Sequence, residues 1–153
     1  MGKSEYVPFD PLKYAGNSTD LIALDGHFRT NNITTFNITN NGKLKRIQIG
    51  NDCFGKVRVF YLDGLSELES VVIGVRSFTY SGDYRSLEKR SDGDYRIVNC
   101  PKLQSIQIGD YSFSDYNSFE LSNLASLQTV VIGEWCFYYA PSFSLTGLIG
   151  GLV

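Results

Sequence analysis

The chain has 153 residues, the size of one ordinary domain, and a net charge of -2 with 42% apolar residues places it among soluble globular proteins. It has no excess of basic residues that would favour a nucleic-acid partner, and no apolar run approaches the roughly 18 residues of a membrane span. The N-terminus lacks the apolar segment of a secretion signal. We therefore expect a cytoplasmic protein, or a secreted or surface protein if the chain belongs to a longer one.

Residues 1–20 fit no repeat, and we expect them to form an irregular lead-in or a partial cap. Pro8, Pro11 and Gly16 interrupt regular structure within this segment. From Leu21 onward a repeat is faintly visible, in pairs of similar residues that stand at a constant offset. The pairs are Gly26 with Gly50, Phe36 with Phe60 and Ile38 with Leu62. A degenerate first coil suits the end of a solenoid, because its outer face meets water instead of another coil.

The repeat is clear from Leu44 onward. Its 24-residue unit reads Leu-x-x-Ile-x-Ile-Gly-x-x-x-Phe, followed by Phe-x-Leu-x-x-Leu. Eight apolar or glycine positions recur at the same offsets in three units, which begin at Leu44, Leu103 and Leu127. A fixed period of this size predicts a repeat architecture.

The unit that begins at Leu68 is interrupted. It keeps the pattern through Phe78, but the next unit starts at Leu103 instead of at position 92, so this coil carries an 11-residue insertion. Alignment from its far end places the insertion between 79 and 94, where Asp92 and Gly93 give a turn signal. Insertions in repeat proteins map to loops on one face, so we expect a protruding loop or a short hairpin.

Two short strands per coil follow from the spacing of the apolar residues. Ile-x-Ile and Phe-x-Leu both place apolar residues two positions apart, which is strand spacing, and the 10 Tyr and 10 Phe also favour strands. Successive copies of each strand then lie parallel and in register, about 4.8 Å apart. The fold class is therefore mainly β, a solenoid of about 4.5 to 5 coils over residues 21–153. The glycine that ends the first strand permits a tight turn or a positive φ.

Stacked coils align the aromatic residues in two columns inside the solenoid. Their apolar spacing favours core ladders over ligand-stacking platforms. The columns are Phe54, Phe78, Phe113 and Phe137, and Phe36, Phe60, Tyr95, Phe119 and Phe143.

The pattern Leu103-x-x-Ile-x-Ile-Gly-x-x-x-Phe resembles the leucine-rich repeats of the BspA-like type, and the resemblance covers about residues 21–148. It implies a curved leucine-rich-repeat solenoid whose Leu-x-x-Ile-x-Ile strands form the inner sheet, and a function in protein or cell-surface binding. Members of this family often have Pro where Gly109 and its equivalents stand here. No catalytic residue carries over, because the family motif contains none.

The three cysteines are interpreted as structural. Cys53 and Cys136 occupy the same repeat position three coils apart, roughly 14 Å at the strand spacing, whereas a disulfide needs Cα atoms within about 7 Å. Cys100 replaces a core Leu and is expected to behave as a small buried apolar residue. No ligands cluster as a zinc site requires, so we predict no metal and no cofactor.

A protein partner would meet outward positions of the first strand or the insertion. Such a strand face is flat enough for an extended contact, and loops carry function more often than regular elements do. The predicted partner-binding residues are Arg46, Gln48 and Gln107 on the strands, and Tyr84, Arg85, Lys89 and Arg90 in the insertion.

The alternative is a carbohydrate-binding or carbohydrate-active solenoid. Some parallel β-solenoids cleave polysaccharides with carboxylates and an Arg on one outer face. The residues that fit this alternative are Asp83, Asp92, Asp94, Arg96 and Glu120. They are few enough for an ordinary solvated surface, so we favour a non-enzymatic scaffold.

The last unit ends without a polar cap. Uncovered edge strands are templates for pairing, so the chain is either one piece of a longer array or binds another copy at this end. The sequence predicts end-to-end self-association through two strands of the last unit. The residues expected to carry it are Leu127, Val130, Ile132, Phe143 and Leu145.

Overall fold

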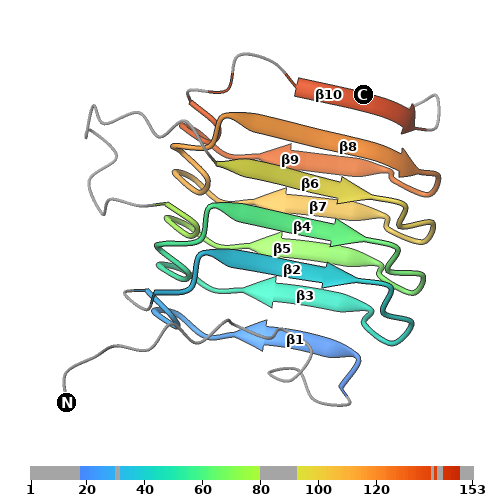
Figure 1. The fold of residues 1–153 in the computed structure, drawn as a ribbon, viewed down its shortest axis with the longest axis horizontal. Coiled ribbons are helices and arrows are strands. Elements are labelled where there is room, and N and C mark those ends of the chain that lie inside the picture. The colour runs from blue at the N-terminus through green and yellow to red at the C-terminus, as the bar shows by residue number, and fades with distance from the viewer. Residues whose placement is uncertain (1–17, 30–31, 80–92, 139, 141–142, 149–153) are drawn as a thin grey trace.

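The computed structural model describes residues 18–29, 32–79, 93–138, 140 and 143–148. This part of the chain contains ten strands and no helix. The strands form a β-solenoid of five turns, with the coils stacked from β1 at one end to β9 and β10 at the other (Figure 1). Two strands per coil and parallel sheets were predicted from the repeat, and both predictions are confirmed.

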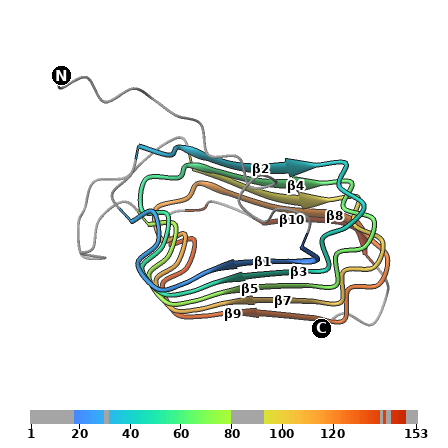
Figure 2. The same ribbon diagram turned by 90° about the horizontal axis from the view of Figure 1, so that it is seen from below.

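The strands divide between two five-stranded sheets that face each other across the core, and they run in opposite directions in the two sheets (Figure 2). Sheet A contains β1 (Asp20–Ala23), β3 (Arg46–Ile49), β5 (Ser70–Ile73), β7 (Ser105–Ile108) and β9 (Thr129–Ile132). Sheet B contains β2 (Thr35–Thr39), β4 (Val59–Asp63), β6 (Asp94–Val98), β8 (Ser118–Leu124) and β10 (Phe143–Leu148).

The register of the sheets follows the repeat except in the first coil. Ile47 pairs with Val71, one repeat later, and Phe60 pairs with Tyr95, its equivalent across the insertion. β1 departs from the repeat by two positions, because Leu21 pairs with Ile47 and not with Lys45. The 24-residue offset predicted from the sequence therefore holds for β2 but not for β1. Gly26 consequently does not lie in the column of Gly50.

The aromatic columns form the centre of the core. Phe78 stacks on Phe54 and on Phe113 with ring centroids 5.1 and 4.7 Å apart, and Phe60 stacks on Tyr95 at 5.0 Å. The two columns meet edge to face, as Phe60 and Phe78 do at 5.2 Å and 84°. Stacked and edge-to-face aromatic pairs stabilise a core by more than the burial of their surface area alone.

Phe28 extends the first aromatic column, which the sequence pattern did not indicate. It stacks on Phe54 with ring centroids 5.1 Å apart. Phe28 stands two positions too early for the repeat, whereas Phe36 is in step with Phe60, so the first coil is longer by two residues between its columns. The 24-residue pattern therefore does not include Phe28, which lies 26 residues before Phe54.

Every coil turns through three residues in the left-handed backbone region. Twelve of the described residues with positive φ are not glycine. Together with three glycines they repeat by coil, and the three columns are Gly26, Asp52, Arg76, Tyr111 and Trp135; Phe28, Phe54, Phe78, Phe113 and Phe137; and Asn40, Gly64, Asn99, Asn123 and Gly147. Left-handed conformations therefore belong to the repeat, although only Gly and Asn adopt them readily.

The glycines that end the sheet A strands do not have positive φ, in contrast to one sequence-based expectation. They are required because the stacked backbones approach closely at this corner. A Cβ added at Gly74 would lie 2.6 Å from the carbonyl carbon of Gly50, and one at Gly109 would lie 2.6 Å from that of Gly74. Real Cβ atoms do not tolerate such distances.

Replacing Gly74 with Ala should lower the free energy of unfolding by about 1–3 kcal/mol, because backbone atoms of the neighbouring coil must move to make room. Gly42 provides the matched control, since an added Cβ there would only contact Ser66 Oγ at 3.6 Å. Gly42→Ala should change the same free energy by less than about 0.5 kcal/mol. Urea unfolding of both variants checks the comparison, and equal effects would contradict it.

Two buried tyrosines give opposite predictions for the same change. Tyr95 is fully buried, and its hydroxyl has no hydrogen-bond partner among the described residues, so Tyr95→Phe should raise the free energy of unfolding by about 1 kcal/mol. The Tyr116 hydroxyl donates to the Val57 carbonyl at 2.7 Å, so Tyr116→Phe should lower it by about 1 kcal/mol. Thermal and urea unfolding measure both changes, and a loss of stability in Tyr95→Phe would refute the assignment.

Candidate interaction surfaces

The outer face of sheet A carries three of the predicted partner-binding residues. Arg46, Gln48 and Gln107 are exposed there, and Arg46 Nε lies 3.2 Å from Asp20 Oδ1. The pairing register places Gln48 beside Ile22 and, on the far side of β5, Gln107 beside Val131. The other predicted contact residues, Tyr84, Arg85, Lys89 and Arg90, lie outside the described residues.

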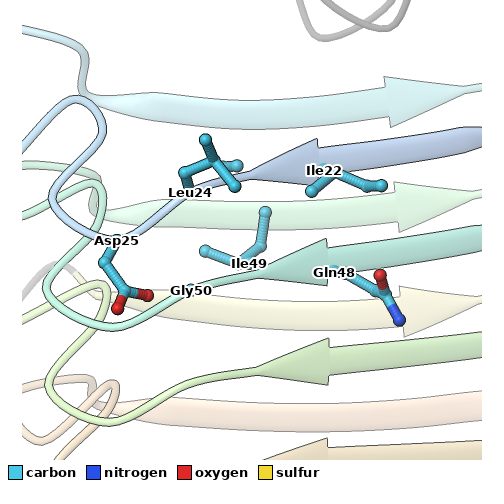
Figure 3. A pocket seen from close by; sticks show the side chains of 7 residues that line it. Ile22, Leu24, Asp25, Gln48, Ile49 and Gly50 are labelled. Atoms are coloured by element: carbon cyan, nitrogen blue, oxygen red, sulfur yellow. The ribbon is translucent and has the colours of Figure 1, made fainter.

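An open depression of about 500 Å³ lies at the first-coil end of sheet A (Figure 3). Ile22 and Leu24 are its exposed apolar residues, and Gln48 and Asp25 are polar side chains at its edge. The Asp25 carboxylate accepts a hydrogen bond from the backbone N–H of Asn51 at 2.8 Å, which holds it at the corner after β3. The depression offers a shallow apolar contact without a convergent set of polar groups.

A charged cluster lies on the outer face of sheet B, where β4, β6 and β8 are neighbours. Arg96 Nε lies 3.6 Å from Asp94 Oδ2 and 3.3 Å from Glu120 Oε1, and the guanidinium carbon lies 5.9 Å from the centre of the Tyr61 ring. The structure thus brings together three of the residues named for the carbohydrate alternative. Asp83 and Asp92, the other two, lie outside the described residues.

Tyr61 and Asp63 form a short hydrogen bond beside this cluster. The Tyr61 hydroxyl donates to Asp63 Oδ2 at 2.6 Å, and Asn99 Nδ2 donates to Asp63 Oδ1 at 2.9 Å. These two hydrogen bonds lower the pKa of the Asp63 carboxyl below its usual value, and the bond to Asp63 raises the pKa of Tyr61. The pair therefore orients Tyr61 along the sheet surface.

Each of the three cysteine thiols donates a hydrogen bond to a backbone carbonyl, that of Leu24, Val98 or Gly109. Cys53 and Cys100 are buried, Cys136 is half-buried, and none of them forms a disulfide among the described residues. Burial raises the pKa of Cys100 and of Cys136 to about 11, which keeps both thiols protonated at neutral pH.

In the described part of the chain no three His, Cys, Asp or Glu side chains are grouped as a metal site would need. Nor does the described chain contain a helix with the length and apolar character of a bilayer span.

The last coil exposes side chains that earlier coils bury. Phe143 and Leu145 lie in register with Phe119 and Leu121, but their exposed fractions are 48% and 54%, against 2% and 1% for those partners. In β9 the inward residues Val130 and Ile132 are half-buried, whereas the equivalent residues of β3, β5 and β7 are buried. We call the surface formed by Val130, Ile132, Phe143 and Leu145 the end face.

The predicted self-association residues largely coincide with the end face. Of the five, only Leu127 is buried, with an exposed fraction of 3%. The structure adds Trp135 and Tyr138, whose rings are exposed and lie 5.0 Å apart at the corner of the last coil. The repeat pattern did not single them out because they occupy corner positions outside its apolar columns. Trp135 shares its corner position with Asp52, Arg76 and Tyr111, so the residue type at this position does not distinguish the last coil.

The low pKa of Asp63 predicts a pH dependence of stability. Because the folded pKa is depressed, the contribution of this carboxylate is present above about pH 4 and is lost as the pH falls through the folded pKa. Asp63→Asn should therefore make the free energy of unfolding fall less steeply between about pH 4 and pH 2. Tyr61→Phe should give an intermediate slope, since one donor to Asp63 remains. Urea titrations at each pH measure the slopes, and identical slopes would contradict the assignment.

We compared the chain with protein-family models, with curated proteins and with solved structures, and none of them matches it. The pairing register and the strand order show a parallel β-solenoid repeat protein built from 24-residue coils.

Proposed function

We propose that the protein is a non-enzymatic repeat scaffold that binds protein, and that the end face is its principal binding surface. One observation carries this proposal. The inward side chains of β9 are half-buried and those of Phe143 and Leu145 in β10 are about half-exposed, whereas the equivalent side chains of the other coils are buried. A soluble protein that leaves core-type residues uncovered at one place offers a site for association.

The chemistry of the end face suits the addition of a further strand. β9 and β10 are the outermost strands of their sheets, so each presents a row of backbone groups along its outer edge. A partner strand would supply those hydrogen bonds and also cover Phe143 and Leu145. Covering the exposed halves of these two side chains contributes about 1 kcal/mol each. Main-chain bonds and side-chain contacts together are the usual mode of strand addition.

The composition of the last coil is also typical of an interface. Between residues 127 and 148 only Glu134 is charged, whereas seven residues are charged between 44 and 67. The same segment contains five aromatic residues, namely Trp135, Phe137, Tyr138, Tyr139 and Phe143. Depletion of charge and enrichment of aromatic residues distinguish the core of a protein interface from the rest of a surface.

The proposal includes the leucine-rich-repeat assignment. The sequence pattern that resembles the BspA-like type supports it, as does the sheet formed by its Leu-x-x-Ile-x-Ile strands. Protein or cell-surface binding is the function that this resemblance implies. The assignment and the end face thus point to the same class of activity.

Carbohydrate binding is the second candidate, and the charged cluster of sheet B favours it. Tyr61 offers a ring, and Asp94, Arg96 and Glu120 offer polar groups on one face. These groups already pair with one another, so a sugar would have to replace existing contacts. We rank this candidate second for that reason. Binding on a glycan array that is lost in an Asp94→Ala, Arg96→Ala double variant would favour it.

Photo-crosslinking tests the principal proposal. Benzoylphenylalanine at position 143 places the crosslinker on the end face, and the same residue at position 61 places it on the outer face of the same sheet. After irradiation with extract of the cells that make the protein, we expect protein adducts from position 143 in clear excess over position 61. The adducts include any formed with a second copy. Equal yields from the two positions, or none from position 143, would refute the end face as the binding surface.

A further inference from the structure

The two ends of the solenoid differ in the state of their apolar columns. At the first-coil end Leu21, Phe36 and Ile38 have exposed fractions of 0%, 0% and 1%. At the other end Phe143 and Leu145, which continue the columns of Phe36 and Ile38, are about half-exposed. Head-to-tail stacking would thus set the half-exposed columns of the last coil against columns that are already covered, because the exposed Ile22 and Leu24 of the first coil do not belong to the columns. Head-to-tail stacking would therefore gain little further burial of the first coil's apolar columns.

The two ends also differ in charge, because the first coil contains more charged residues than the last coil. Asp20, Asp25 and Arg29 are charged and belong to the first coil, and Asp20 forms an ion pair with Arg46 at its edge. The Asp20 and Asp25 carboxylates already have partners in the second coil, Arg46 and the Asn51 backbone amide, and an apolar end face would offer them no further polar partner. A second end face brings only Glu134 from each copy, because no other residue between 127 and 148 is charged. The end face is therefore better matched to itself than to the opposite end.

The strand directions allow this match to form hydrogen bonds. Sheets A and B run in opposite directions, and β9 and β10 are their outermost strands (Figure 2). A twofold axis perpendicular to the stack can bring two end faces together in two ways. Either β9 meets β9 and β10 meets β10, or each β9 meets the β10 of the other copy. In both arrangements the facing strands are antiparallel, so both edges can form ladder hydrogen bonds.

We infer that the end face binds the end face of a second copy, which gives a closed twofold dimer joined by antiparallel edge strands. The inference rests on the proposed function and names the partner of that surface. In an isologous contact of this kind the same surface of each copy is fully occupied by the other copy, so the assembly closes at two chains. A head-to-tail contact would continue into a filament.

Two residues of the last coil provide a matched pair of variants. Leu145 lies in register with the buried Leu121 and has an exposed fraction of 54%. Val131 lies on the outer face of sheet A and has an exposed fraction of 56%. Lysine at either position removes a similar exposed aliphatic side chain and adds one charge. Only Leu145→Lys places that charge between the two copies, where it weakens association by about tenfold or more.

The assembly is measured by sedimentation and by light scattering over a concentration series. The parent chain and Val131→Lys should reach twice the monomer mass of 17.1 kDa and remain there. Leu145→Lys should stay monomeric and still unfold in one cooperative thermal transition, at a midpoint below that of the dimeric parent chain. Hydrogen exchange of the parent chain should slow with concentration in β9 and β10 but not in β1, and this readout needs no variant. Trp135, the one tryptophan of the sequence, should shift its emission to shorter wavelength as the dimer forms.

Three results would overturn the inference. They are a monomer at every concentration, a mass that keeps growing beyond the dimer with slowed exchange in β1, and a Leu145→Lys variant that dimerises as well as the parent. If the chain is monomeric while position 143 crosslinks to a different protein, the dimer is wrong and the proposed binding surface stands. If position 143 gives no adduct and the chain is monomeric, both are wrong.

Discussion

Close stacking of each coil on the next is the constraint on which this structure depends. Backbone ladders at about 4.8 Å force every side chain to lie on the same position of the neighbouring coil. Polar side chains follow this rule as the aromatic rings do. Ser77 Oγ accepts a hydrogen bond from the Cys53 amide at 3.1 Å and donates to the Gly50 carbonyl at 2.7 Å. Ser112 Oγ repeats the arrangement with the Ser77 amide and the Gly74 carbonyl, at 3.0 and 2.6 Å. Each coil is thus completed by its neighbour.

The same stacking maintains a backbone that isolated coils would not adopt. Phenylalanine in the left-handed region is disfavoured by about 1–2 kcal/mol relative to the right-handed region. Phe54, Phe78 and Phe113 adopt it with φ of 55°, 57° and 54°, and all three are fully buried. Burial of one such side chain contributes about 1.5–3 kcal/mol, which is enough to offset the strain. The corner conformation is therefore a consequence of the column and does not arise from local preference.

Among the described residues β9 and β10 are the outermost strands, and their inward side chains are partly exposed. The inward residues of the last coil have the chemistry of a core, with Phe143 packed on Phe119 at 4.6 Å on one side and exposed on the other. The corner aromatics Trp135 and Tyr138 border this surface, and Glu134 is the one charge in the coil. The feature that makes the repeat fold, an apolar strand edge that needs a partner, is the feature that we assign to binding. No separate site has to be added to the repeat to provide this activity.

The repeat pattern was sufficient to predict most of the architecture, because period and strand spacing are both written in the order of apolar residues. Leu103, Ile106 and Ile108 are buried as their spacing required, and the strands pair in parallel at the predicted offset. The pattern also identified Phe143 and Leu145 as residues of the last coil. It did not show how exposed they are, since exposure depends on whether another coil lies above them.

The sequence by itself determined the period, the two strands per coil and the residues that point inward, since each of these follows from the spacing of side chains along one chain. Only the tertiary structure decided the conformations of the corners. There Gly74 lies where an added Cβ would be 2.6 Å from the neighbouring backbone, and Phe28 joins the aromatic column although it is out of step with the repeat. The tertiary structure also decided which end leaves its columns exposed. Both features depend on distances between coils, and a linear pattern of residue types does not contain those distances.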